Sequence, residues 1–395
     1  MPRAEQQQPL LAAQQRRPDS YLFPRWWFVV MALPNILPGL VGTAFGSIVW
    51  PLAVAKLAGF QDKALVFALC AQVGVVMSWS APFIGVWSDK TPPWIARRFG
   101  RRRPFIFVGG LSFWLGNLLN YIAIRGLSEP SPVLLGVGLV TMNLGGCISG
   151  PAFNAIVPET VPLPQRGLSI TVQAWLTYIC ALLGNGVGWM LGEQTFPWLT
   201  DDLIWRANIA MVGLQVPLQL IACNGTAGWW RPEHSATELQ PAPPPTRDAA
   251  TATVGESGCG RSTVAAVREF VGSFRYPTYR WYWVFCAINT LANIIDTSFT
   301  FFWLQDCFTE FRFFGVSVAT NVKSAVALQG MVISFLPIFT ISLLQPQKWR
   351  ERHGGRQVML WSTALLYFVR PFSFVIWQGE FTLVLLWTIF QVQIQ

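Results

Sequence analysis

A basic stretch between two apolar runs holds the residues best placed for chemistry in this sequence. Residues 88–105, SDKTPPWIARRFGRRRPF, contain six lysines and arginines and a single acid, Asp89. Opposite charges at neighbouring helix ends can pair, and at an effective dielectric constant near 20 a pair roughly 4 Å apart interacts by about 4 kcal/mol before desolvation is subtracted. An interaction of this size can bias an equilibrium between two conformations. The stretch therefore suggests an ionic latch and not a bond-breaking site.

The residue types that usually catalyse reactions or bind metals are scattered. His234 and His353 are far apart in the sequence and lack companion ligands at a metal-binding spacing. The seven cysteines show no paired spacing, and most of them fall in apolar runs, where a thiol packs as a small apolar group. The sequence therefore predicts no metal site, no cofactor and no enzymatic activity.

One motif is similar to a nucleotide-binding loop. GESGCGRS, residues 255–262, matches the phosphate-binding loop pattern except that Arg261 replaces its lysine. That loop requires a preceding strand within an α/β fold, and the surrounding sequence favours neither. We therefore predict no nucleotide binding.

The elements that must position these residues are apolar. Only 12% of the residues are charged and 52% are hydrophobic, whereas soluble domains are about 25% charged. Runs of the length needed to cross a bilayer recur, and because they are continuously apolar they favour helices over barrel strands. The predicted fold class is all-α, a multi-pass protein of the lipid bilayer. The ten expected segments are 26–55, 64–87, 105–124, 132–157, 168–192, 203–223, 281–304, 316–344, 358–378 and 381–395.

The distribution of cations predicts the orientation. Lysines and arginines are retained on the cytoplasmic side, and with a cytoplasmic N-terminus most of the 28 fall in alternate connections. The exceptions are Lys56, Lys63, Arg125, Arg206, Arg312, Lys323 and Arg370. The net charge of +9 therefore indicates topology, and we predict no nucleic-acid partner.

The polar middle of the chain divides it into two halves. We expect a cytoplasmic tail at 1–25, an N-terminal six-helix bundle at 26–223, a flexible cytoplasmic linker at 224–280 with an amphipathic helix near 262–276, and a four-helix C-terminal bundle at 281–395. The halves align when Gly74 is placed on Gly330, which also superposes Ser78 on Ser334 and brings a basic loop after each copy. Internal repeats of this kind build transporters, with the solute site near the bilayer midplane between them.

Three stretches carry a resemblance to a known family. Gly85, Ser88 and Asp89, followed by RFGRRRPF at 98–105, resemble the loop between helices two and three of the major facilitator superfamily. NAIVPETVPLPQRG at 154–167 resembles its junction between helices four and five, and YWVF at 282–285 with WLQD at 303–306 is similar to its helix seven. The form of the first motif resembles the glycoside-pentoside-hexuronide:cation symporters, the plant sucrose transporters and the solute carrier family 45 proteins.

The resemblance implies a two-bundle architecture with about ten of the family's twelve helices in this chain, and therefore a C-terminally incomplete sequence. It also places the loop charges at the cytoplasmic ends of helices two to five, where they would hold the inner side closed. A simpler alternative is that the cations only set the topology. The expected latch residues are Gly85, which would let helix two approach a neighbour closely, Asp89, Arg98, Gly100, Arg101, Arg102, Glu159 and Arg166.

Polar residues inside the apolar segments are the candidates for solute contact. Amides both donate and accept hydrogen bonds, as a hydroxyl-rich ligand requires, although each could instead join two helices. Asp296 is the candidate for proton coupling, because an ionisable group within the membrane is costly; a structural acid is the alternative. The candidate solute-binding residues are Asn35, Gln72, Asn143, Asn154, Gln173, Asn289 and Asn293.

These features predict a secondary transporter that works by alternating access, with a sugar or glycoside such as sucrose as the small-molecule solute and a proton as the coupling ion. Two alternatives stay open: a membrane scaffold or receptor that does not transport, and a facilitator of another small organic solute. We expect a multi-pass protein located in the plasma membrane or an organelle membrane, with a cytoplasmic N-terminus.

Overall fold

The computed structural model describes residues 23–78, 80–89, 91, 94–95, 99–100, 102–157, 161, 163–224, 272, 275, 280, 300–344 and 381–392. The expected segment at 358–378, nearly all of the expected linker and most of the expected segment 281–304 lie outside the described residues.

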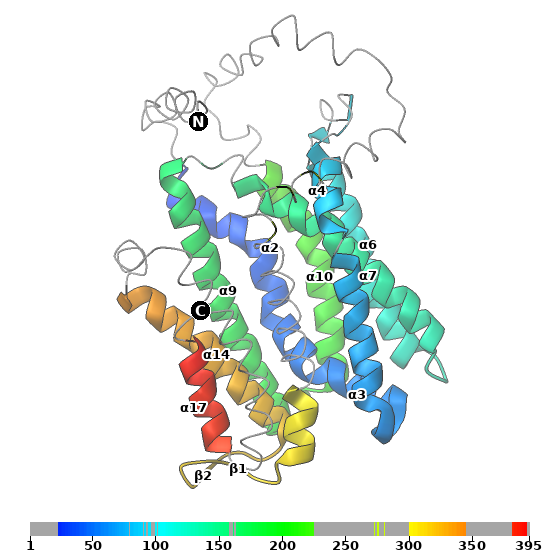
Figure 1. Ribbon diagram of the computed structural model, residues 1–395, viewed down its shortest axis with the longest axis vertical. Helices are drawn as coiled ribbons and strands as arrows, with labels where there is room; N and C mark the ends of the chain where they lie inside the picture. Colours follow the sequence, from blue (N-terminus) through cyan, green and yellow to red (C-terminus); the bar gives the residue numbers. More distant parts are fainter. Residues whose placement is uncertain are drawn as a thin grey trace, which may run out of the picture.

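The N-terminal half consists of long helices that run between the same two ends of the molecule (Figure 1). Proline occupies the first turns of α6 and α7, where its missing N–H group has no helical partner to lose. The elements are α2 Arg25–Ala44, the π-helical turn η2 Phe45–Val49, α3 Trp50–Ser78, α4 Ala81–Asp89, α6 Arg103–Tyr121 with the π-helical turn η3 Ile122–Gly126, α7 Pro132–Asn154, α9 Leu163–Gly192 and α10 Asp201–Asn224.

Six helices of the described part are long and apolar enough to cross a membrane, which confirms the first six predicted segments. Gly59 separates the first two, because its φ of 77° and ψ of 170° interrupt the helical path within α3. The spans are Gly39–Gly59, Asp62–Gly85, Arg103–Gly126, Pro132–Asn154, Gln165–Gly192 and Asp201–Cys223.

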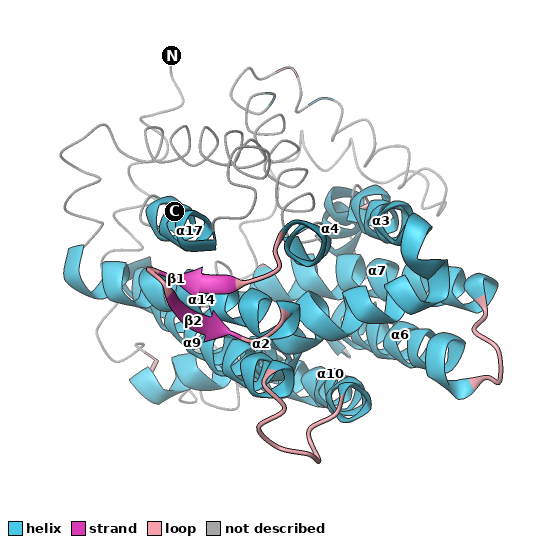
Figure 2. Ribbon diagram, turned by 90° about the horizontal axis from the view of Figure 1, so that it is seen from below, coloured by secondary structure: helices cyan, strands magenta, loops and turns pink. Residues whose placement is uncertain are grey.

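The C-terminal half begins, in its described part, with helical residues 300–307 and continues into a hairpin of β1 Phe311–Phe313 and β2 Val316–Ala319. Helices α14 Val322–Leu344 and α17 Phe381–Val392 follow. Figure 2 shows the hairpin lying against α14. Thr382 on α17 joins the hairpin as well, because its hydroxyl accepts from the Phe314 N–H group and donates to the Arg312 carbonyl, both at 3.1 Å.

The prediction of an uninterrupted helix at 316–344 was wrong at its start, and the hairpin was not predicted. Phe314 and Gly315 both have positive φ, 49° and 86°, which is the two-residue turn that antiparallel strands favour. The helix starts later because Asn321 and Ser324 cap it reciprocally, each side chain accepting from the backbone N–H of the other at 3.2–3.3 Å. Apolar content alone did not reveal either signal.

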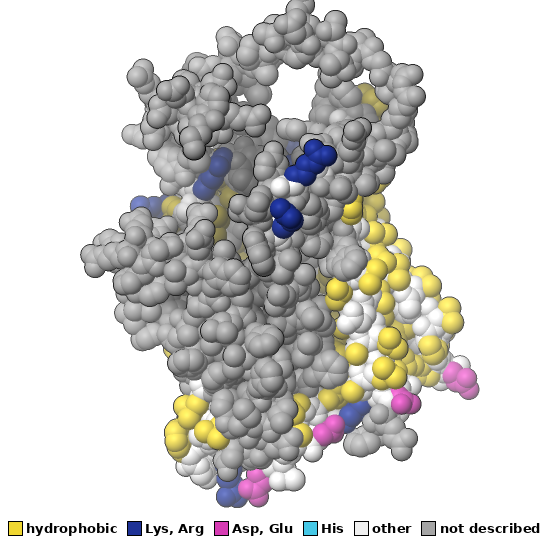
Figure 3. Space-filling model, viewed as in Figure 1, with side chains coloured by type: hydrophobic (Ala, Val, Ile, Leu, Met, Phe, Trp, Pro, Cys, Tyr) yellow, Lys and Arg dark blue, Asp and Glu magenta, His cyan; other side chains and the backbone are white. Residues whose placement is uncertain are grey.

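The two ends of the bundle are distinguished by the residues that lie at them. The loop end is where Phe23, Gly100, Arg103 and Val161 lie, and the hairpin end is where the β hairpin, Gly192 and Asp201 lie. Figure 3 shows a hydrophobic flank with acidic and basic side chains below it, at the hairpin end. Such an apolar flank is what a bilayer requires of a membrane-spanning bundle.

Close packing within the N-terminal half depends on glycine. Cβ atoms at Gly116 and Gly145 would collide with the backbones of Met142 and Phe113, so α6 and α7 touch backbone to backbone. Lipid provides little hydrophobic drive for helix association, and close approach of this kind replaces it.

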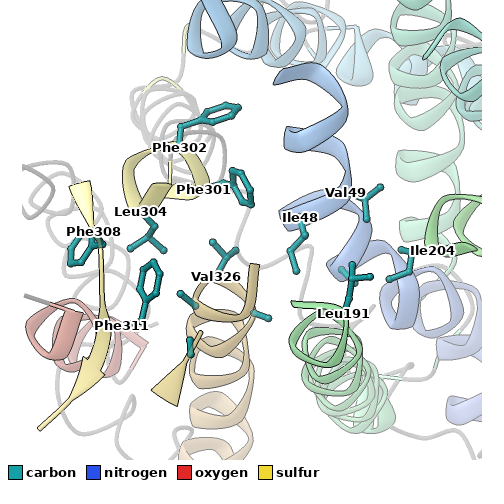
Figure 4. Packing of buried hydrophobic residues seen from close by; sticks show 14 of the residues in the cluster. Ile48, Val49, Leu191, Ile204, Phe301, Phe302, Leu304, Phe308, Phe311 and Val326 are labelled. Atoms are coloured by element: carbon teal, nitrogen blue, oxygen red, sulfur yellow. The ribbon is translucent and has the colours of Figure 1, made fainter. Parts of the chain in front are cut away.

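A hydrophobic cluster joins the two halves near the hairpin end. Figure 4 shows Phe301 and Val326 of the C-terminal half on one side, and Ile48 and Leu191 of the N-terminal half on the other. All four side chains are buried. The halves therefore share one core at this end.

Candidate functional site

At the loop end, the end of α4 is tied to the start of α6. The Ser88 hydroxyl is fully buried; it donates to the Gly85 carbonyl at 2.8 Å and accepts from the Arg102 guanidinium. Gly100 lies in the intervening loop with φ of +81°, a conformation that favours glycine. Two of the predicted latch residues, Gly100 and Arg102, therefore shape and anchor this loop.

Gly85 shows no close helix contact within the described part of the chain. We expected it to let helix two approach a neighbour closely, but no described atom lies within 4 Å of the position a Cβ would take there. Its observed contact is made through its carbonyl, which any residue could supply. A close approach of helix two at Gly85 therefore stays a prediction.

The junction between α7 and α9 is anchored by two side chains of the first turn of α9. Arg166 donates from Nε to the Val161 carbonyl at 3.0 Å. Gln165 forms two hydrogen bonds with the backbone of Phe23, both at 2.9 Å, which fixes α9 against the start of α2. Arg166 therefore lies at the loop end, and its part in an ionic latch stays a prediction.

A cavity of about 250 Å³ lies beside Arg166. Asn154 and Gln173 line it too, so the structure brings together one predicted latch residue and two predicted solute-binding residues. Gln173 donates to the Ser169 hydroxyl at 3.5 Å, and Asn154 is exposed. The remaining wall is apolar, with Met31 and Phe153 among its residues. A small polar solute could contact a cation and two amides here.

Two other predicted solute-binding residues lie elsewhere. Asn143 donates to the Leu139 carbonyl of its own helix at 2.9 Å, and its Oδ1 lies 3.0 Å from the Cβ position of Gly74. Gln72 is exposed on α3. For Asn143 this geometry favours the helix-packing alternative.

Part of the predicted site is not described. The side chains of Asn35 and Asp89 lie outside the described residues, although their backbones belong to α2 and α4. An ion pair within the latch therefore stays a prediction. The other undescribed residues are Arg98, Arg101, Glu159, Asn289, Asn293 and Asp296.

The hairpin end holds charged contacts between the halves that sequence reasoning missed. Lys63 of α3 pairs with Asp306 at 2.7 Å and also donates to Gln305 at 3.2 Å. The Lys63 side chain is only 6% exposed and that of Asp306 is 47% exposed. The Lys63 ammonium also lies 5.5 Å from the centre of the Phe302 ring. A nearly buried cation is therefore compensated from the opposite half.

A second group of polar contacts joins α9 and α10 to the start of α14. Lys323 pairs with Asp201 at 3.0 Å. The Glu193 carboxylate accepts from the backbone N–H group and the hydroxyl of Thr320, both at 2.9 Å. Asn321 donates to the Gly192 carbonyl at 2.6 Å. Ion pairs and hydrogen bonds of this kind can break and re-form without covalent change, as a gate requires.

The sequence did contain a signal for these pairs. Lys63 and Lys323 were exceptions to the cation distribution, each at the end of a segment on the side opposite the basic loops. Asp201 and Asp306 also stand at segment ends on that side. Matching the exceptional cations to acids at the same membrane face would have suggested that ion pairs form there. It would not have shown which cation pairs with which acid.

We expect acidification to weaken the hairpin-end contacts through Glu193. Burial raises the pKa of this carboxyl, but hydrogen bonds from the Ser324 side chain and from Thr320 outweigh it and hold the pKa below its ordinary value of 4.5. The carboxylate therefore stabilises the hairpin-end contacts above pH 4.5, and this contribution is lost as the pH falls through the lower pKa of the folded state.

The midpoint of thermal unfolding, measured between pH 7 and pH 3.5, tests this expectation. As the pH falls below about 4.5, the midpoint should drop less in Glu193→Gln than in the wild type. Thr320→Val keeps the backbone donor and removes the hydroxyl, so its drop in midpoint should lie between those of the wild type and Glu193→Gln. Identical pH profiles for wild type and Glu193→Gln would contradict the assignment.

Comparison with known proteins gives one sequence relative and several structures. No protein-family model matches the sequence. The sucrose transport protein SUC3 of Arabidopsis thaliana is 25% identical over 198 residues, which are 44% of this chain and 31% of that protein. The chain therefore matches about a third of the length of that relative.

The solved structures cover more of the chain. A D-xylose–proton symporter superposes with a TM-score of 0.53 and 14% identity over 93% of this chain and 78% of its own. A peptide transporter in complex with sulfate gives a TM-score of 0.56 and 13% identity over 93% and 79%. At these identities the likeness establishes the fold and leaves the solute open.

Proposed function

Because this chain has the major facilitator fold, we propose that it is a secondary transporter of a small organic solute that works by alternating access. The observation that carries the proposal is the junction at the hairpin end, where Lys63–Asp306 and Asp201–Lys323 join the two halves. Each pair has one partner in either half, so separating the halves breaks both. The junction is suited to reversible opening.

The predicted topology gives the two ends their roles. With a cytoplasmic N-terminus, the hairpin end faces the outside and acts as the outer gate. The loop end, with Ser88, Gly100, Arg102 and Arg166, faces the cytoplasm and acts as the inner gate. The cavity lined by Asn154, Arg166 and Gln173 then lies on the cytoplasmic side of the solute path.

We infer that the solute is a sugar or glycoside and the coupling ion a proton. The similarity to a sucrose transport protein and to a D-xylose–proton symporter supports this inference. Asp296 is the proposed proton carrier, since 100 mV favours inward movement of one charge by about 2.3 kcal/mol, roughly a 50-fold solute gradient. The likeness to a peptide transporter keeps a second class of solute in view.

Uptake into cells that express the protein tests the proposal. We expect saturable accumulation of sucrose, maltose or xylose above cells with an empty vector, and loss of accumulation when a protonophore is added. Asp296→Asn should abolish accumulation and leave exchange of labelled for unlabelled sugar, because exchange needs no net proton movement. A dipeptide provides the alternative solute. No uptake of any of these solutes above the empty vector would argue for a membrane scaffold or receptor instead.

A further inference from the structure

A second and larger hollow lies on the surface of the loop end, away from the junction between the halves. Its volume is about 550 Å³. Its walls come from residues 94, 95 and 99, from the first turns of α6 and from the end of α10. The lining residues used below are Trp94, Phe99, Arg103, Phe107, Val108 and Leu220.

The hollow combines a cation with an apolar wall. Arg103 is the charged residue among those that line it, and its charge also acts on the nearby Cys223 thiol. Arg102, the residue that precedes α6, brings a second cation to this end of the helix, so the local field attracts anions. An acidic group attached to an apolar body would be complementary to both parts.

The hollow opens onto the outer face of α6. Phe107 and Val108 are about half exposed, and Leu111 and Leu115 continue the exposed apolar stripe one and two turns further along the helix. The stripe runs from the end of the helix toward the middle of the expected span Arg103–Gly126. A ligand with a long apolar tail can pack along this stripe, whereas a soluble anion without a tail makes no apolar contact with it.

The depth of the hollow fits the membrane–water boundary. Trp94 is 69% exposed, and tryptophan side chains concentrate at the level of lipid headgroups. Arg103 is the first residue of α6, at the end of an expected span. Its charge is therefore placed where a phosphate group of the bilayer would lie.

We propose that this hollow binds a phospholipid with an anionic headgroup. The phosphate contacts Arg103, and one acyl chain passes Phe107 and Val108 and continues along the α6 stripe. Basic pockets at the ends of membrane helices bind acidic lipids in this way, and each arginine near the surface contributes enough to change affinity about fivefold. The site is distinct from the proposed solute path and does not depend on the transport proposal.

Native mass spectrometry of the whole protein tests the site. Protein released from nanodiscs of phosphatidylcholine with one tenth phosphatidylglycerol should retain a copy of phosphatidylglycerol. Arg103→Gln should reduce its occupancy about fivefold, and Arg103→Lys should reduce it less because the charge is kept. Arg125→Gln is the matched control, since Arg125 is an exposed arginine at the other end of the same span.

Further variants separate headgroup from tail. Val108→Asn should lower retention of the lipid without removing a charge, and glycerol phosphate, which has the headgroup chemistry and no tail, should not compete. Unfolding in pure phosphatidylcholine nanodiscs checks that each variant is folded. Equal loss of lipid in Arg103→Gln and Arg125→Gln would overturn the proposal, as would equal retention of phosphatidylcholine and phosphatidylglycerol by the wild type.

Discussion

Replacing Asp306 by alanine is expected to open the hairpin end of the protein. The substitution removes the carboxylate that pairs with the nearly buried Lys63 ammonium. Removing one partner from a buried pair costs about 3–5 kcal/mol, and because Asp306 is half exposed we expect about 2–3 kcal/mol here. That shifts the equilibrium toward the open form by roughly 30- to 150-fold. The neighbouring Cys307 reports opening through its rate of reaction with a membrane-impermeant maleimide, resolved by mass spectrometry.

Glu310→Gln is the matched control for this substitution. Glu310 pairs with Arg312 at 2.9 Å in the same region, but its side chain is 64% exposed and that of Arg312 is 59% exposed. An exposed pair contributes about 0–1 kcal/mol, so the rate at Cys307 should change less than about fivefold. Combining Asp306→Leu with Lys63→Met should restore slow modification, because no buried charge is left. Equal rates in Asp306→Ala and Glu310→Gln would show that the pair does not hold the end closed.

Replacing Gly192 by leucine is expected to prevent closure of the same end by a steric route. A Cβ at Gly192 would lie 2.5 Å from the amide nitrogen of Ser324 and 2.9 Å from its Cα, so helices α9 and α14 must separate. Separation also breaks the bond from Asn321 to the Gly192 carbonyl. Forcing side-chain atoms into a packed contact costs about 3 kcal/mol or more when backbones meet. We expect uptake to fall at least 100-fold.

The steric prediction has a control on the same helix. Gly186 of α9 has no described atom within 4 Å of its Cβ position, so Gly186→Leu should leave uptake within about twofold of the wild type. The distance between spin labels at the ends of α9 and α14 should increase in Gly192→Leu and not in Gly186→Leu. Retained uptake with an unchanged label distance in Gly192→Leu would contradict backbone contact between these helices.

The sequence predicted the fold through physical constraints that act along the chain. A helix that crosses lipid must satisfy its own backbone and cover itself with apolar side chains, so α6, α7, α9 and α10 are visible as runs of the required length. Residues that cap or turn the chain were harder to place. Asn321 and Ser324 start α14 six residues after the predicted start of its segment, and only their reciprocal hydrogen bonds show why.

The candidate site was predicted in part for a similar reason. Arg102 was singled out because the stretch 88–105 is dense in cations, and Arg166 because its stretch at 154–167 resembles a family motif. Lys63 and Asp306 are separated by more than two hundred residues, and nothing local to either indicates its partner. Pairing across such a distance depends on how the two halves meet, which the sequence does not state.

The bond between Thr382 and the β hairpin has a mechanical consequence. The Thr382 hydroxyl bonds to the backbone of both Phe314 and Arg312. The hairpin therefore connects the start of α14 to the start of α17. Any force that pulls Lys323 away from Asp201 is thereby delivered to both helices together. Helices α14 and α17 would then move as one unit at this end, with the hairpin connecting them.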